Sequence, residues 1–168
     1  DRQYLPDDNV LLFSVESGSA NQFILDLSKN TKRGLQSKLE KGWQNGIAPL
    51  GYLNDKENKT IISDPERFNL IRKMWDLMLT GNYTPPKILD IANNEWGFRT
   101  RKFKRMGGYP LSKSGIYAIF TNLFYARIIK VNGVQYAGAH EPMITLDEYD
   151  RVQMLLGREG KPRPKSHE

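Results

Sequence analysis

The chain has 168 residues, of which 25 are lysine or arginine and 19 are aspartate or glutamate, for a formal net charge of +6. This length accommodates one ordinary domain with a flanking element. The absence of cysteine excludes a disulfide framework and a zinc site with cysteine ligands. The apolar runs are too short to span a bilayer, and the basic excess favours a polyanionic partner.

A basic helix is predicted first, beginning near Ser19 or Asn21 and ending at Gly42. Residues 1–13 before it combine turn formers with a short apolar run. The apolar residues of this helix recur at near-helical spacing at Phe23, Ile24, Leu27, Leu35 and Leu39. The basic residues around them are Lys29, Lys32, Arg33, Lys38 and Lys41. Such a charge pattern fits a solvated face as well as a face that lies along DNA phosphates.

An extended connector is predicted over residues 43–53, because Asn45-Gly46, Pro49 and Gly51 break any periodicity. It carries two aromatic residues, Trp43 and Tyr52. A strap of this kind is thin enough to follow the minor groove of DNA. An ordinary interdomain linker is the alternative.

Residues 54–157 predict a compact, mainly helical domain. One helix has Asp64 as N-cap and Pro65 at its first position, and it ends at Gly81. A second helix begins at residues 84–86, Thr-Pro-Pro, and ends at Gly97. Both carry wide apolar stripes, for which packing in the core is the expected role.

The sharpest basic cluster falls in a predicted loop or ribbon at residues 98–111. From Arg99 to Lys113 there are six basic residues and no acidic one. A third helix then begins at Ser112, and its first turn offers small or hydrogen-bonding groups that suit the major groove of DNA. The alternative is a plainly capped helix in a three-helix core beside a solvated ribbon.

A β-hairpin is predicted over residues 127–136, because Asn132-Gly133 is a type I′ turn signal. Thr145 and Glu148 predict a capping box for the last helix, which ends at Gly157. This helix is predicted to bury Leu146, Tyr149, Val152 and Leu155. The predicted fold class is mainly α with a small β component: a long N-terminal helix followed by a helix-turn-helix or winged-helix-like domain with a β-hairpin.

Two short motifs resemble the junction between the catalytic and DNA-binding domains of large serine recombinases, the family of serine integrases and transposon resolvase-type enzymes. In that family a long helix with an N-x-K-R-G signature leads to P-x-G-Y. The corresponding residues here are Asn30-Thr31-Lys32-Arg33-Gly34 and Pro49-Leu50-Gly51-Tyr52. The resemblance continues to about Gly157, so it covers most of the chain.

The resemblance implies four segments. Residues 1–42 are the end of a catalytic domain with its linker helix, and residues 43–53 are a minor-groove strap. Residues 54–157 are the recombinase DNA-binding domain, and residues 158–168 are a basic, proline-rich tail or linker. In the family a module with a zinc ribbon commonly follows.

The implied function is sequence-specific binding of double-stranded DNA at recombination (att-like) sites. The parent enzyme would carry out DNA recombination or integration for a mobile element such as a transposon, as a dimer to tetramer on DNA. The residues expected to contact DNA are Lys32, Arg33, Lys38, Lys41, Trp43, Tyr52, Arg99, Arg101, Lys102, Lys104, Arg105, Ser112, Lys113, Ser114 and Tyr117. The apolar face around Phe23, Ile24 and Leu27 is a candidate for self-association.

No catalytic residue, metal site or cofactor is predicted. The family nucleophile lies in a Y-x-R-x-S context that does not occur here, and the serines at positions 14, 17, 19 and 28 are expected in turns and caps. His140 and His167 are the only histidines, too few for a metal site without cysteine. We expect a piece of a larger cytoplasmic protein that associates with the bacterial nucleoid when bound and has no membrane partner.

Two alternatives stay open. A helix-turn-helix transcription regulator would use the same DNA-binding physics without a recombinase parent. A protein-interaction module would use its N-terminal helix as a coiled-coil arm, and its basic ribbon would merely be solvated.

Overall fold

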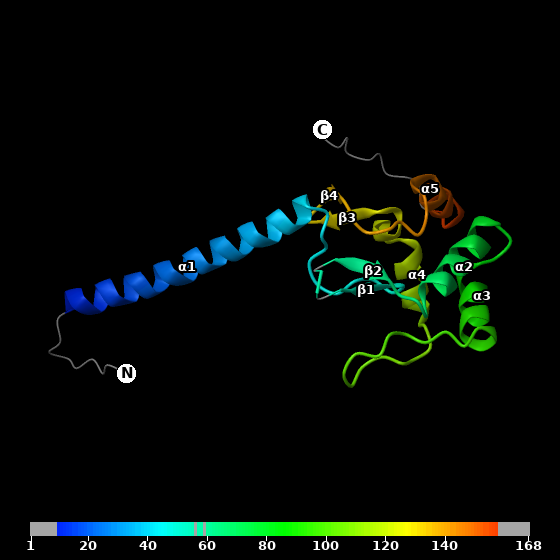
Figure 1. Cartoon of the computed structure of the whole chain (residues 1–168), viewed down its shortest axis with the longest axis horizontal. Coiled ribbons are helices and arrows are strands. Elements are labelled where there is room, and N and C mark those ends of the chain that lie inside the picture. The colour runs from blue at the N-terminus through cyan, green and yellow to red at the C-terminus, as the bar shows by residue number, and fades with distance from the viewer. Residues whose placement is uncertain (1–9, 56, 59, 158–168) are drawn as a thin grey trace. The chain divides into compact units, whose positions relative to one another are not determined.

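The computed structural model describes residues 10–55, 57–58 and 60–157 (Figure 1). The chain divides into two compact units, Asp1–Lys38 and Leu39–Glu168. The functional boundaries predicted above stay predictions, and the tail at 158–168 lies outside the described residues. Within the described part, no helix is long and apolar enough to cross a membrane.

The described part of the first unit belongs to helix α1 (Val10–Glu40). The prediction that this helix begins near Ser19 or Asn21 is therefore wrong. Ser14 and Ser19 do not interrupt it, because each hydroxyl donates back to a helix carbonyl, Ser14 Oγ to Val10 O (2.9 Å) and Ser19 Oγ to Glu16 O (2.9 Å). All four serines expected in turns and caps, at positions 14, 17, 19 and 28, therefore lie inside α1.

The predicted helix stop at Gly42 is confirmed. Its amide donates to the Leu39 carbonyl (2.9 Å), and its φ of +73° is in the left-handed region that favours glycine. A Cβ at this position would lie 2.6 Å from the Ala137 carbonyl oxygen. Glycine is therefore required both for the backbone turn and for the close approach of residues 137–139.

The second unit contains short helices and two antiparallel hairpins, which confirms the mainly α fold class with a small β component. Its helical elements are α2 (Phe68–Leu79), α3 (Pro85–Asp90), the π-helical η1 (Ile91–Glu95), α4 (Lys113–Phe120), the 3-10 turn η2 (Leu123–Ala126) and α5 (Leu146–Leu155). Strand β1 (Tyr52–Asn54) pairs with β2 (Ile61–Ser63), and β3 (Ile128–Val131) pairs with β4 (Val134–Ala137).

Trp75 of α2 lies fully buried in the core of this unit. Its ring meets Phe120 of α4 edge to face with centroids 5.2 Å apart, and it lies 5.9 Å from Tyr125 of η2. The α2 stripe predicted from the sequence is buried with it, including Ile71, Met74 and Met78. These aromatic contacts join α2, α4 and η2 into one core.

Local capping signals fix the starts of α4 and α5. Ser112 caps α4 by accepting the Gly115 amide (3.1 Å), and Thr145 and Glu148 form the predicted capping box of α5. The predicted start of α2 at Pro65 is wrong by three residues, because residues 64–67 form a turn. In that turn the Asp64 carboxylate accepts the Glu66 amide (3.0 Å) and the Arg67 guanidinium (3.0 Å).

The β3–β4 hairpin confirms the type I′ prediction. Asn132 and Gly133 have φ of 52° and 84° between the paired residues Val131 and Val134. The burial predicted for Leu155 is wrong, since this side chain is 44% exposed while Val152 is fully buried.

The connector at residues 43–53 is packed on the domain rather than free. Tyr52 is fully buried, and its hydroxyl donates to the Glu141 carbonyl (2.8 Å). The Tyr125 hydroxyl donates to the Leu50 carbonyl (2.8 Å). The prediction of a DNA contact at Tyr52 is therefore wrong, because its side chain belongs to the core.

Candidate nucleic-acid interface

Residues 98–111, which we call the basic ribbon, form a narrow two-armed loop that projects from the helices of the second unit (Figure 1). The arms are joined by backbone bonds from Thr100 N to Tyr109 O (2.9 Å) and from Gly108 N to Thr100 O (3.0 Å). At the tip, Phe103 and Met106 exchange two backbone hydrogen bonds of 2.7 and 2.9 Å. A Cβ on Gly107 would collide with the Arg101 carbonyl, so this glycine permits the arms to approach.

The root of the ribbon is held by Asn93 of η1. The Asn93 side chain donates to Leu111 O (2.9 Å) and accepts the Leu111 amide (2.8 Å). The Arg99 guanidinium donates to Phe98 O (2.7 Å) and to Asn93 O (3.3 Å). One asparagine therefore contacts both the first and the last part of the ribbon.

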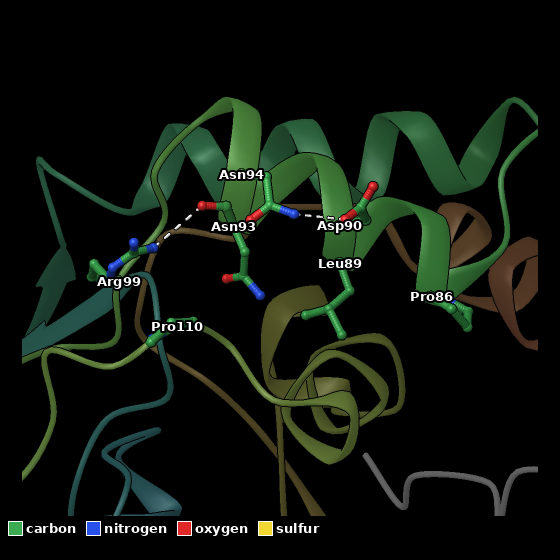
Figure 2. Close-up of a pocket in the computed structure, with 7 residues that line it drawn as sticks. All are labelled: Pro86, Leu89, Asp90, Asn93, Asn94, Arg99 and Pro110. Carbon is green, nitrogen blue, oxygen red and sulfur yellow. Dashed lines mark hydrogen bonds between the residues drawn. The ribbon is translucent and has the colours of Figure 1, made fainter.

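Beside this root lies an open pocket of about 330 Å³. Figure 2 shows it between the α3–η1 segment and Pro110, with Leu89 and Pro86 along its apolar side. The Asn94 amide donates to Asp90 (2.6 Å), and Arg99 reaches the Asn93 carbonyl, so the polar groups of the pocket are tied to one another. The hydrogen bonds that line this pocket, rather than the pocket itself, hold the root of the ribbon.

Of the ribbon cations, Lys102, Lys104 and Arg105 are exposed around the tip. Arg101 is half-buried, and its guanidinium donates to Tyr52 O (2.9 Å) and Ala48 O (3.4 Å). Arg101 therefore connects the ribbon to residues 48–52, a role that sequence reasoning missed. Arg99 is exposed, although its guanidinium also bonds at the root.

The first turn of α4 follows the ribbon directly. Ser112, Lys113 and Ser114 are exposed, and the Ser112 hydroxyl shares a 3.1 Å hydrogen bond with that of Ser114. Tyr117, one turn later, is half-buried and packs against the core. The buried Leu111 fixes the junction between ribbon and helix.

The remaining predicted residues lie on α1 and at the start of the connector. Lys32, Arg33 and Lys38 are exposed on α1. Lys41 is also exposed, and its ammonium lies 5.7 Å from the centroid of the half-buried Trp43 ring.

Phe103 and Met106, which are 57% and 75% exposed at the ribbon tip, are not among the residues expected from the sequence to contact DNA. Their position between basic residues was the available signal. Among the described residues, no group of three or more histidine, aspartate or glutamate side chains could hold a metal ion.

No family model and no curated protein matches the sequence. Solved structures that share its fold include the following two. One is the crystal structure of an LSR–DNA complex, LSR standing for large serine recombinase, with a TM-score of 0.59 and 20% identity over 77% of this chain and 38% of that chain. The other concerns the sequence requirements of the Listeria innocua prophage attP site, with a TM-score of 0.61 and 19% identity over 79% of this chain and 53% of that chain.

These comparisons establish a shared fold. They confirm, at the level of fold, the resemblance to large serine recombinases that residues 30–34 and 49–52 predict. The chain spans about half or less of the length of the two proteins it matches.

Proposed function

We propose that this chain is the DNA-binding part of a large serine recombinase and that it binds duplex DNA sequence-specifically at recombination (att-like) sites. The observation that carries the proposal is an exposed basic ribbon, fixed at its root, that leads directly into the first turn of α4. The fold shared with an LSR–DNA complex and with an attP-site structure supports it. Lysine and arginine supply the attraction to phosphates, and short polar side chains at a helix start suit base edges.

Each part of the surface has a role in this proposal. Ser112, Lys113 and Ser114 read base edges in the major groove, with Tyr117 beside them. The ribbon cations other than Arg101 contact phosphates, as do Lys32, Arg33, Lys38 and Lys41 at and just after the end of α1. Trp43 and the exposed residues 46–47 of the connector lie along the minor groove, while Arg101 holds the connector in place.

The parent protein in this proposal recombines DNA as a dimer to tetramer and supplies catalysis from outside this chain. Phe23, Ile24 and Leu27 of α1 are 69%, 62% and 57% exposed. Apolar side chains exposed in this way favour burial against another surface. In this proposal α1 mediates self-association of the protein. The protein lies in the cytoplasm and associates with the nucleoid when it is bound to DNA.

The test is a selection from a random-sequence duplex library at about 150 mM salt, where nonspecific binding is already weakened. We expect one enriched motif and a discrete footprint on it. Recovery of unrelated sequences would show that the protein binds DNA only through a nonspecific basic surface, and this result would refute the proposal.

Variants of the first turn of α4 test the assignment of base contacts. Ser114→Ala and Lys113→Ala should each weaken binding to the enriched motif by about 1–3 kcal/mol and relax its consensus at one position. Arg151→Ala is the matched control, since Arg151 is exposed on α5, away from these elements in sequence. Equal losses for Arg151→Ala and Lys113→Ala would contradict the assignment.

A further inference from the structure

The tip of the basic ribbon carries two large apolar side chains. Phe103 and Met106 are 57% and 75% exposed. They are paired directly across the turn by their two backbone hydrogen bonds. Residues paired in this way on antiparallel arms project from the same face, so the two side chains form one apolar point.

The apolar point is flanked by cations along the chain. Lys102, Lys104 and Arg105 are its sequence neighbours and are all exposed, and the Lys104 ammonium lies 5.8 Å from the centroid of the Phe103 ring. The ribbon itself contains no acidic residue. An apolar tip flanked by positive charge complements a groove of a duplex, where stacked base pairs lie between two rows of phosphates. The minor groove is the one in which apolar side chains insert between base steps.

The ribbon below the tip is held by several hydrogen bonds. Asn93 bonds Leu111 from both of its amide atoms, Thr100 bonds across the ribbon to Tyr109, and Arg101 bonds the connector carbonyls. Lys104, within the turn, has a φ of 53°, so the turn is tight. A tip supported in this way can keep its conformation when it presses against a binding partner.

We propose that the ribbon tip is a DNA wedge. Phe103 and Met106 enter the minor groove and insert between neighbouring base pairs, which unstacks them and bends the duplex, while Lys102, Lys104 and Arg105 bind the flanking phosphates. Flexible steps such as TA are the preferred target, because they cost least to unstack. This inference rests on the proposed DNA-binding function and adds a deformation of the site to it.

The experiment uses the full chain and its F103A, M106A and double variants. M154A is the matched control, because Met154 on α5 is 73% exposed against 75% for Met106. F103L retains an apolar tip and tests for rescue. All of these side chains are largely exposed, so we expect Tm to stay within about 2 °C of the wild type.

The probe is an alternating dT–dA duplex that contains one 2-aminopurine, which reports unstacking, and carries a donor and an acceptor dye at its ends, which report bending. The duplexes from the library selection are measured beside it. The wild-type protein and M154A should raise the 2-aminopurine fluorescence and shorten the dye-to-dye distance. The double alanine variant should lose both signals and bind about tenfold more weakly. Its salt dependence should be unchanged, since every cation remains.

The outcomes separate the wedge from the proposed function. A double alanine variant that bends and binds both probes like the wild type would overturn the wedge, while an enriched library motif would leave the proposed function standing. Loss of binding in F103L equal to that in F103A would also overturn it, because an apolar tip would then not suffice. Failure of the wild-type protein to enrich any motif would refute the proposed function. Separately, the absence of any 2-aminopurine fluorescence change with the wild-type protein would refute the wedge.

Discussion

His140 is a buried histidine whose two ring nitrogens have different surroundings. Its ring stacks on Phe124 with centroids 3.7 Å apart, and its Nε2 lies 2.7 Å from the Phe124 carbonyl. A carbonyl only accepts, so Nε2 carries the hydrogen, whereas the buried Nδ1 has no hydrogen-bond partner among the residues that the structure describes. Burial lowers the pKa of His140, and the charge of Arg127 lowers it further, against the opposing effect of the Phe124 carbonyl.

Protonation of His140 should therefore destabilise the fold. The folded state holds the pKa below the ordinary value of 6.5, so the unfolded state binds the proton first as the pH falls. The stabilisation is fully present above that value and is lost as the pH drops through the lower folded pKa. Urea unfolding between about pH 7.5 and pH 5 should show a falling midpoint. A His140→Gln variant should lose this slope; an identical slope in the variant would assign it to other groups.

Arg101 has a connecting role that a lysine cannot fill. Its planar guanidinium reaches two carbonyls at once, those of Tyr52 and Ala48. An ammonium group is a point donor, so Arg101→Lys should lose about 1–2 kcal/mol of stability. Amide hydrogen exchange should become faster in residues 48–52 and in the ribbon. Lys102→Ala removes the adjacent exposed cation and serves as the control, and equal stability losses in the two variants would contradict the connecting role.

At the level of whole elements, an ion pair ties α2 to the start of α5. Arg72 of α2 makes two hydrogen bonds to the Glu148 carboxylate (2.9 and 2.6 Å) and one to the Met143 carbonyl (2.9 Å). Glu148 also accepts the Thr145 amide (2.7 Å) in the capping box. The bond from Arg72 is the main reason that the pKa of Glu148 falls from 4.5 to about 2.

This pair should stabilise the domain at neutral pH and fail in acid. A carboxyl group with a lowered folded pKa contributes its stability above the unfolded value of 4.5 and loses it as the pH falls towards about 2. Glu148→Gln retains a side chain that can complete the capping box but removes the charge, and it should cost about 1–2 kcal/mol at pH 7. The difference from wild type should shrink below about pH 4. Asp147→Asn makes the same charge change one residue earlier, and a cost equal to that of Glu148→Gln would refute the specific role of Arg72.

For the molecule as a whole, the sequence predicted a helix start or a turn correctly where the residues that form it are close neighbours in the chain. The caps at Ser112 and Thr145 and the Asn132-Gly133 turn depend on residues within a few positions, and the structure confirms them. The start of α1 was predicted wrongly for a local reason as well, because a serine can cap a helix or bond back into it, and the two patterns look alike in sequence.

The candidate interface could be predicted only in part, because long-range contacts decide which polar and aromatic residues remain available. Tyr52 is removed from the surface by a bond to Glu141, 89 positions away, and Arg101 bonds to Tyr52 across 49 positions. Neither contact has a sequence signal. The exposure of the cations at the ribbon tip could be predicted without knowledge of long-range contacts, because charged side chains mostly stay in water.

The overall charge pattern leads to a last prediction about salt. Each cation that neutralises a DNA phosphate releases counterions and adds about 0.9 to the slope of log affinity against log salt. Lys104→Ala should therefore reduce the slope by about one and weaken binding to all duplexes evenly. Ser114→Ala should leave the slope unchanged and alter the sequence preference instead.

Titration of binding at several salt concentrations, with matched and unmatched duplexes, measures both quantities on the same samples. Arg151→Ala is again the control for loss of a surface cation. A slope reduced equally by Arg151→Ala would mean that net charge, rather than ribbon geometry, drives association. A change of sequence preference in Lys104→Ala would place its ammonium on a base edge instead of a phosphate, since phosphates carry no sequence information.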